Sequence, residues 1–298
     1  MIILLTGASG FIGQALVNEI LKTGSHELVL LTTKQFQGIK SIPHGDYSFT
    51  KQDFYNNGVA HIDVVIHLGA FIPKSAKEAN DINRTTSNIQ NTLWLLNNLP
   101  SMPSRVIFIS STDVYGKGCG EKMNEETPLR PDTLYGWSKV YCEILIKTWC
   151  LENGVDHQIL RLGHIYGPGE EAYSKLIPVT IRRVLRGENP RLFTIGEEKR
   201  SFLYIDDCVR LINRALDLTK GQDPINIVSS QIFSIRDIVG DIIKLGGRDI
   251  QMDVVENVSS GQDLIFENNK MQQYLGVEIT SFQDGIRNEY LHFLNKES

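Results

Sequence analysis

The chain has 298 residues, of which 41% are hydrophobic and 22% are charged, and its formal net charge is −5. These values are ordinary for a globular protein of one or two domains, and the negative charge leaves no basic surface for nucleic acid or an anionic membrane. No apolar run approaches the roughly 20 residues that span a bilayer, and no leader precedes the first predicted strand, so we expect a cytoplasmic protein. The cysteines contain no Cys-x-x-Cys pair, which argues against a disulfide framework and against a metal site; they are Cys119, Cys142, Cys150 and Cys208.

The first predicted element is a short buried strand over residues 2–5, followed by turn residues and then by apolar residues at helical spacing from Phe11 onward. Three glycines, Gly7, Gly10 and Gly13, therefore lie at a strand-to-helix junction. Unpaired backbone N–H groups and the positive end of the helix dipole meet at such a junction and bind phosphate. The Gly-x-x-Gly-x-x-Gly spacing differs from the commoner Gly-x-Gly-x-x-Gly pattern, but its position favours a dinucleotide pyrophosphate over an ordinary turn.

A second strand is predicted over residues 27–31, and it ends in Thr32, Thr33 and Lys34. In NAD-binding folds an acidic residue at this place accepts the adenosine ribose hydroxyls. Hydroxyl groups and an ammonium would instead bind a 2′-phosphate, so we expect a modest preference for NADP(H) over NAD(H). The alternative is that Lys34 is an ordinary solvated lysine, as most lysines are.

Residues 52–54 resemble the short segment that packs beside the adenine ring of a dinucleotide, so we expect Asp53 to bond the adenine amino group and Phe54 to lie beside it. The third clear strand covers residues 63–67. Small residues after it would let the backbone lie close to the cofactor; this segment is Leu68, Gly69 and Ala70.

A helix is predicted over residues 83–99 and another buried strand over residues 105–109. Strands and helices of these lengths alternate along the chain, which predicts an α/β fold with a doubly wound parallel sheet.

Tyr135 and Lys139 are four residues apart at the start of a predicted helix, so both face the same side. A free tyrosine has a pKa of ~10, but a neighbouring ammonium lowers that pKa and lets the phenol exchange a proton with a hydroxyl or carbonyl. Lys139 would also hold the nicotinamide ribose, and Ser111, at a strand end, would hydrogen-bond the same substrate oxygen. A Tyr-x-x-x-Lys pair alone is usually an ordinary pair on a helix surface. Here it follows the glycine loop and the serine at the strand end in the chain, and this combination predicts a catalytic site.

These motifs resemble the extended short-chain dehydrogenases/reductases, in the epimerase/dehydratase branch that modifies sugar nucleotides. The resemblance rests on residues 6–13, 67–70, 110–116, 135–139, 161–168 and 200–207. It implies a Rossmann-type sheet of about seven strands with a smaller α/β substrate-binding cap. The implied boundaries are 1–165 for the dinucleotide-binding domain, with 199–229 returning to it, and 166–198 and 230–298 for the cap. A homodimer formed by the helices at 83–99 and 136–150 is implied as well.

The resemblance also implies individual roles. Ser111, Tyr135 and Lys139 would be the catalytic residues. Asn83 would support the site from its helix, and the pyrophosphate would lie on Gly7, Gly10, Phe11, Ile12 and Gly13. The substrate would contact Ser111, Thr112, His164 and Arg200.

Two positions depart from the family pattern. The family usually has an asparagine where His164 stands, and a histidine can still donate to a phosphate oxygen or simply be satisfied by local backbone. The family often carries an arginine that grips the substrate diphosphate in the segment that here reads Ser259-Ser-Gly-Gln-Asp263, with no arginine.

In the reactions that the resemblance implies, a hydride moves at C4 of a nucleoside-diphosphate sugar while Tyr135 handles the O4 proton. Thr112 is no acid, which argues against 4,6-dehydration, and Asp113 is either a base next to a ketone or a turn residue. We expect a 4-keto-6-deoxy-sugar nucleotide reductase, with a nucleotide-sugar 4-epimerase as the close alternative. A reductase for non-nucleotide carbonyl compounds and a non-catalytic dinucleotide-sensing relative are the remaining alternatives, and the intact Ser111, Tyr135 and Lys139 set argues against the last.

Overall fold

The computed structural model describes residues 1–118, 121–171, 173–221, 223–247, 249–255 and 261–297. Cys119 and the first two residues of the 259–263 segment lie outside these ranges. The other cysteines, Cys142, Cys150 and Cys208, are buried free thiols. No helix within the described ranges combines the length and the apolar character that crossing a bilayer requires.

A sheet of seven parallel strands forms the centre of the molecule, which confirms the predicted fold class. The strand order is β10-β6-β5-β4-β1-β2-β3, so the direction of strand succession reverses between β1 and β4. In open parallel sheets ligands bind at such a reversal, outside the carboxyl ends of the strands. The strands are β1 (Ile2–Thr6), β2 (Glu27–Thr32), β3 (Lys40–Pro43), β4 (Val64–His67), β5 (Arg105–Ser111), β6 (Asp156–Leu162) and β10 (Ile225–Ile227).

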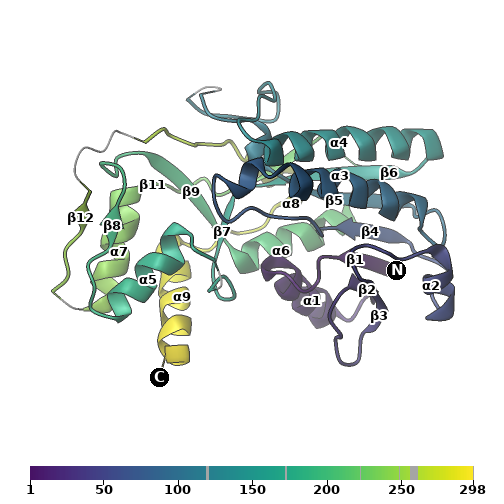
Figure 1. Ribbon diagram of the computed structural model, residues 1–298, viewed down its shortest axis with the longest axis horizontal. Helices are drawn as coiled ribbons and strands as arrows, with labels where there is room; N and C mark the ends of the chain where they lie inside the picture. The colour runs from purple at the N-terminus through teal and green to yellow at the C-terminus, as the bar shows by residue number, and fades with distance from the viewer. Residues whose placement is uncertain (119–120, 172, 222, 248, 256–260, 298) are drawn as a thin grey trace.

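Helices cover both faces of this sheet (Figure 1), with α1 beside α6 on one face and α3 beside α4 on the other. Successive strand residues point to opposite faces, so Ile3 and Leu5 belong to the core under α1 and α6, whereas Leu4 belongs to the core under α3 and α4. The helices and 3₁₀ turns of this part are α1 (Phe11–Thr23), α2 (Lys51–Asn56), η1 (Glu78–Asn80), α3 (Ile82–Asn97), η2 (Thr112–Val114), α4 (Leu134–Asn153), α6 (Ile205–Arg214) and η3 (Ala215–Asp217).

Two small sheets and three helices lie together at the other end of the molecule (Figure 1). One sheet has the order β11-β9-β7 and the other pairs β12 with β8. Helix α7 packs against α5 and α9. The elements are β7 (His164–Tyr166), α5 (Leu176–Leu185), β8 (Arg191–Leu192), β9 (Lys199–Tyr204), β11 (Ile232–Ser234), α7 (Ile235–Gly246), β12 (Asp253–Val254) and α9 (Phe282–Glu297).

The chain passes between the two parts more often than the predicted boundaries imply. Strand β9 lies in the predicted returning segment 199–229, yet it pairs with β7 and β11 of the small sheet. Helix α8 (Asn269–Leu275) lies in the predicted cap segment 230–298, yet it contacts β10 of the large sheet. The small sheet and the large sheet are therefore tied together by several chain crossings.

Candidate active site

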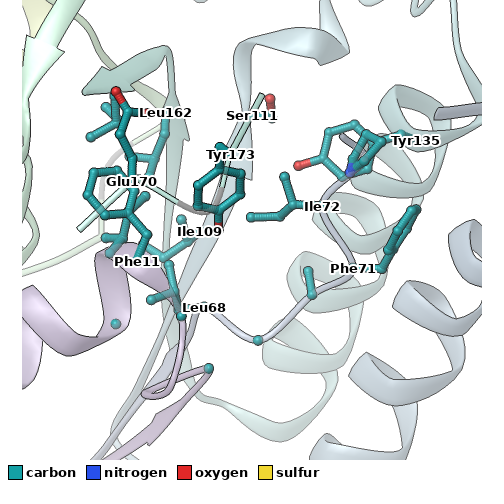
Figure 2. Close-up of a pocket in the computed structure, with 18 of the residues that line it drawn as sticks. Phe11, Leu68, Phe71, Ile72, Ile109, Ser111, Tyr135, Leu162, Glu170 and Tyr173 are labelled. Carbon is teal, nitrogen blue, oxygen red and sulfur yellow. The ribbon is translucent and has the colours of Figure 1, made fainter. Parts of the chain in front are cut away.

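A cavity of about 720 Å³ opens at the carboxyl edge of the large sheet, where the strand order reverses. Figure 2 shows Ser111 and Tyr135 on one side of it and Phe11, Glu170 and Tyr173 on the other. Most of the residues predicted for the site line this cavity: Gly7, Gly10, Phe11, Ile12, Gly13, Thr32, Thr33, Leu68, Gly69, Ala70, Ser111, Thr112, Tyr135, Lys139, His164 and Arg200.

The glycine loop forms a cradle that larger residues would fill. Gly7 has a φ of 75°, and a Cβ added to it would lie 2.7 Å from the backbone nitrogen of Gly69. A Cβ on Gly13 would lie 2.1 Å from the carbonyl oxygen of Gly7, so only glycine permits this packing of α1 on β1. Gly10 is the N-cap residue of α1, and it has no side chain that could accept a hydrogen bond from the first turn. The N-terminal N–H groups of the helix are therefore open to the cavity. These residues fit the pyrophosphate of a bound dinucleotide.

Tyr135 and Ser111 both line the cavity. Thr133 caps α4 by accepting a hydrogen bond from the backbone of Gly136 at 3.1 Å, which fixes the helical turn that carries Tyr135. The Ser111 side chain lies beside the Tyr135 hydroxyl in the cavity. Burial, reinforced by the neighbouring Asp113, raises the pKa of Tyr135, whereas the nearby Ser111 side chain opposes that rise.

Lys139 lies in the cavity wall but does not act on Tyr135 as predicted. Its ammonium donates a hydrogen bond to the carbonyl oxygen of Ile109 at 2.8 Å and lies 4.9 Å from the ring centre of Phe108. Burial lowers the pKa of Lys139 to about 8. The expected lowering of the Tyr135 pKa by this ammonium is therefore wrong for the structure as it stands, because the carbonyl of Ile109 holds the ammonium.

Asp113 lies in the 3₁₀ turn η2 and also lines the cavity. It is therefore a turn residue, and its position also allows contact with a bound substrate. Its backbone N–H donates to the Ser111 hydroxyl at 3.1 Å. Burial raises the pKa of Asp113. The cavity thus holds a second proton-exchanging group next to Tyr135.

A buried polar network supports the catalytic residues from below. Glu143 and Arg161 form an ion pair at 2.7 Å, and both side chains are almost fully buried. Ser110 donates to Glu143 at 2.6 Å, Arg161 donates to the Tyr115 hydroxyl at 2.9 Å, and that hydroxyl donates to Asn226 at 2.7 Å. The network therefore joins α4, β5, β6 and β10 directly behind Ser111 and Lys139.

Two cavity residues can meet an anionic ligand at the cap side. Arg200 donates to the carbonyl oxygens of Lys199 at 2.8 Å and Gln262 at 2.6 Å, which fixes its guanidinium. Lys175 is the N-cap residue of α5, but its side chain makes no capping hydrogen bond. Its ammonium lies 4.8 Å from the ring centre of Tyr173. No sequence pattern marks Lys175 beyond its place before a predicted helix.

His164 is neutral in this setting. Burial, together with the charges of Arg200 and Lys175, lowers its pKa to about 4. Its Nδ1 is buried and has no hydrogen-bond partner among the described residues. It therefore faces the cavity as a neutral imidazole rather than as a cation.

Three predicted cofactor contacts lie elsewhere. Asp53 closes a capping box with Thr50 at the start of α2, and Phe54 is fully buried in the core, so neither lines the cavity. Lys34 is exposed and outside the cavity, and its backbone N–H donates to the Thr32 hydroxyl at 3.2 Å. The Thr32 hydroxyl accepts this bond and keeps its own O–H to donate, so Lys34 is the one residue of the segment 32–34 that lies outside the cavity.

Asn83 is the fourth predicted residue that the structure places away from the site, because its side chain is exposed on α3. Asn88 does the supporting work instead. Its side chain accepts from the backbone N–H of Phe71 at 2.7 Å and donates to the Phe71 carbonyl at 3.2 Å and to Ser138 at 3.3 Å. The helical spacing of the buried residues of α3 was the signal that could have identified it.

Comparisons with known proteins agree with this geometry. The model of the NAD dependent epimerase/dehydratase family matches residues 3–228. A UDP-N-acetyl-alpha-D-glucosaminuronate decarboxylase of Bacillus cytotoxicus is 30% identical over 260 residues, which cover 81% of this chain and 79% of that protein. An uncharacterized UDP-glucose epimerase of Bacillus subtilis is 27% identical over 310 residues, covering 97% and 96%. The UDP-glucuronic acid 4-epimerase of Bacillus cereus, solved with NAD, has a TM-score of 0.83 and 26% identity, covering 98% of this chain and 96% of that one.

Proposed function

The chain belongs to the NAD-dependent epimerase/dehydratase family, and we propose that it is a nucleotide-sugar 4-epimerase that works with bound NAD. The observation that carries the proposal is the arrangement of one cavity: a glycine cradle for a dinucleotide at one end, and Ser111, Tyr135 and Lys139 at the other. Bound NAD would supply reversible hydride transfer at C4 of the sugar, so that the C4 hydroxyl could be re-formed with the opposite configuration.

The chain's own residues would handle the proton and the position of the sugar. Tyr135 would take the proton of the C4 hydroxyl and later give it back, with Ser111 as its hydrogen-bond partner. Lys139 would hold the ribose next to the reacting carbon. His164, Lys175 and Arg200 would bind the substrate diphosphate. Together they would take the place of the arginine with which the family often grips this anionic group.

The reductase expected from the sequence has less support than the epimerase. It depended on an NADP(H) site at Thr32, Thr33 and Lys34, and Lys34, the one cation of that set, lies outside the cavity. A 4-epimerase needs no net reductant, and the Bacillus cereus epimerase holds NAD. We therefore propose NAD as the cofactor.

Asp113 supports a second candidate, decarboxylation of a nucleoside-diphosphate uronate. After oxidation at C4, a uronate is a β-keto acid, and loss of carbon dioxide leaves a carbanion at C5 that must be protonated. Asp113, which lines the cavity next to Ser111, would provide that proton from its protonated form. The Bacillus cytotoxicus relative is named as a decarboxylase of this kind.

The test is product analysis by NMR after incubation with UDP-glucose, UDP-N-acetylglucosamine or UDP-glucuronic acid and added NAD. An epimerase gives the C4 epimer with no net change in nicotinamide absorbance. Loss of carbon dioxide from the uronate would favour the second candidate. Consumption of NADPH with a 4-keto-6-deoxy substrate and no epimerisation would contradict both and restore the reductase. A Tyr135→Phe variant, expected to lose about 10²–10⁴-fold in kcat, confirms that the activity belongs to this site.

We also propose that the protein is a homodimer through α3 and α4. Their outer faces carry exposed apolar side chains around a shallow groove, with Ile82, Trp137, Tyr141 and Ile144 each at least half exposed. A contiguous apolar patch of this kind is unusual on a monomer.

A further inference from the structure

Two buried glutamates lie in and behind the cap side of the cavity wall. Glu170 follows β7 and lines the cavity with Phe11 and Tyr173 (Figure 2), and it is 1% exposed. Glu289 belongs to α9 and is fully buried. The two carboxyl groups are near enough for each to affect the ionisation of the other. Carboxylates buried this deeply are normally compensated by a cation or by hydrogen-bond donors.

Hydrogen-bond donors do not compensate this pair. All four carboxyl oxygens are buried and lack a hydrogen-bond partner among the described residues. The cation that approaches them is Lys175, whose ammonium lies 3.5 Å from the Glu170 carboxylate. The ionisation of Glu170 therefore depends on where this ammonium lies.

The other titratable groups around the two glutamates bring no positive charge to them. They are Tyr166 on β7, Tyr173, Tyr204 on β9 and Glu171. Burial raises the pKa of each of these tyrosines, so they stay neutral. Glu171 is itself paired, with Lys296 at 2.7 Å and with His292.

Lys175 also faces the cavity, so Glu170 and a bound anion would compete for its charge. Its side chain is 47% exposed and is therefore free to turn toward a ligand. Burial raises the pKa of Glu170 to about 7, and Lys175 opposes that rise. An anion that draws the ammonium away, and adds its own negative charge nearby, would raise this pKa further. Burial raises the pKa of Glu289 to about 10, so Glu289 stays protonated near neutral pH.

We propose that Glu170, backed by Glu289, is a positioning residue that couples the binding of the substrate diphosphate to the uptake of one proton from solvent. In the empty protein the Glu170 carboxylate holds Lys175 at the cavity wall. When the diphosphate takes the ammonium, the carboxylate loses its counter-ion and accepts the proton. The inference rests on the proposed function, in which Lys175 binds the diphosphate, and it goes further by making a proton a second ligand of the same step.

The test is calorimetric titration of the whole protein with UDP-glucose in buffers of different ionisation enthalpy, which counts the protons taken up on binding. The reference protein carries Tyr135→Phe, so that no turnover accompanies binding. Both phosphates of UDP-glucose are esterified and stay ionised between pH 6 and pH 8, so the ligand itself takes up no proton. The reference is expected to take up about half a proton or more at pH 7.5, and its affinity should fall as the pH rises.

Glu170→Gln removes the titration and keeps the shape of the side chain. Its proton uptake is expected to vanish, and its affinity should equal that of the reference at pH 6 and exceed it by about three- to tenfold at pH 8. A merely structural role would not give tighter binding that is confined to high pH. Glu188→Gln is the matched control, because Glu188 is a half-exposed carboxylate of the cap, 3.7 Å from Arg183 and outside the cavity. This control should keep both the uptake and the pH profile of the reference.

Lys175→Met carries the same test if Glu170→Gln does not fold, as judged by thermal unfolding. Without the ammonium, Glu170 is already protonated before the ligand arrives, so the uptake is expected to disappear while the affinity falls. His164 is a second group of this wall that an anion could protonate, and His164→Asn should keep the uptake.

Unchanged uptake in Glu170→Gln would overturn this inference and leave the proposed function standing, and so would a loss of uptake in His164→Asn alone. Failure of the reference to bind UDP-glucose, UDP-N-acetylglucosamine and UDP-glucuronic acid would contradict the proposed function together with the inference.

Discussion

At the scale of single residues, the site keeps a cation where the fold would be more stable without one. Lys139 is 4% exposed, and burial lowers its pKa to about 8 from an ordinary value of ~10.4. Below pH 8 the folded state must therefore hold a charge that is more favourable in water. The carbonyl of Ile109 and the ring of Phe108 compensate only part of that cost.

Replacing this lysine with an apolar residue of similar length tests the cost. Lys139→Met is expected to lose activity but to have a free energy of unfolding about 1–2 kcal/mol higher than that of the wild type at pH 7. The variant should therefore unfold at a higher denaturant concentration. The folded pKa is lowered, so the unfolded chain binds more protons between about pH 8 and pH 10.4, and the wild type gains stability as the pH rises through that range. The difference between the two proteins should therefore shrink from pH 8 upward in urea titrations. A constant difference would show that lost packing, not charge, sets the effect.

The residue scale also shows what spacing alone can predict. Ser111, Tyr135 and Lys139 were found because their order and separation carry chemistry directly. Asn83 was placed wrongly because its neighbour in role, Asn88, lies five residues further along α3, about 140° around the helix. The prediction for Asp53 was wrong for a related reason. Its side chain forms a capping box with Thr50, three residues earlier, at the start of α2. Each error concerns which way a side chain points, which depends on contacts that the sequence does not print.

At the scale of elements, the Glu143–Arg161 ion pair joins α4 to β6, next to strand β5, which ends in Ser111. Removing one member leaves the other charged and buried, so Glu143→Met is expected to destabilise the protein by about 3–5 kcal/mol. The double variant Glu143→Met/Arg161→Met should recover most of that loss, because neither charge remains. Urea unfolding of the three proteins measures both effects. A double variant as unstable as the single one would assign the cost to lost hydrogen bonds with Ser110 and Tyr115 instead.

Two buried carboxyl groups lie near each other, one on α9 and one in the segment after β7. Glu170 is 1% exposed and Glu289 is fully buried, and burial raises the pKa of Glu170 to about 7 and of Glu289 to about 10. Lys175, 3.5 Å from Glu170, opposes that rise. The folded state therefore keeps protons that the unfolded chain has lost above about pH 4.5, so stability falls as the pH rises from there.

Glu289→Gln removes the titration while keeping the shape of the side chain. The variant should be more stable than the wild type by about 1–2 kcal/mol at pH 8, and the two should be equal near pH 4. Thermal unfolding across this pH range is the measurement. Asp217→Gln, a change of an exposed carboxylate in η3, is the control that should leave the pH profile unchanged. A Glu289→Gln profile parallel to that of the wild type would contradict a raised pKa of Glu289 in the folded state.

Elements of the large sheet were predictable and those of the small sheet were not. The strands over 27–31, 63–67 and 105–109 are continuous apolar runs bounded by turns, and they match β2, β4 and β5 within a residue or two. Strands β7 and β11 have three residues each and no periodicity to detect. Their existence depends on pairing with β9, a contact between distant parts of the chain.

At the scale of the whole molecule, the outer face of α3 and α4 is the surface of the proposed homodimer. Ile144, 60% exposed on α4, lies in the apolar groove of that face. Ile144→Glu would bury a carboxylate in the proposed interface, so it is expected to sediment as a monomer at micromolar concentration where the wild type sediments as a dimer. Leu21→Glu, an equally drastic change at a 47% exposed position on α1, should leave the dimer intact. A monomeric wild type would refute the dimer.

The repeated crossing between the two parts bears on how this protein can be shortened. The family match ends at residue 228, which invites truncation there. Such a fragment would retain every proposed catalytic side chain, yet β9, the strand of Arg200, would lose β11, and α5 would lose α7 and α9. The newly bared apolar surfaces would favour inclusion bodies over a working half-enzyme.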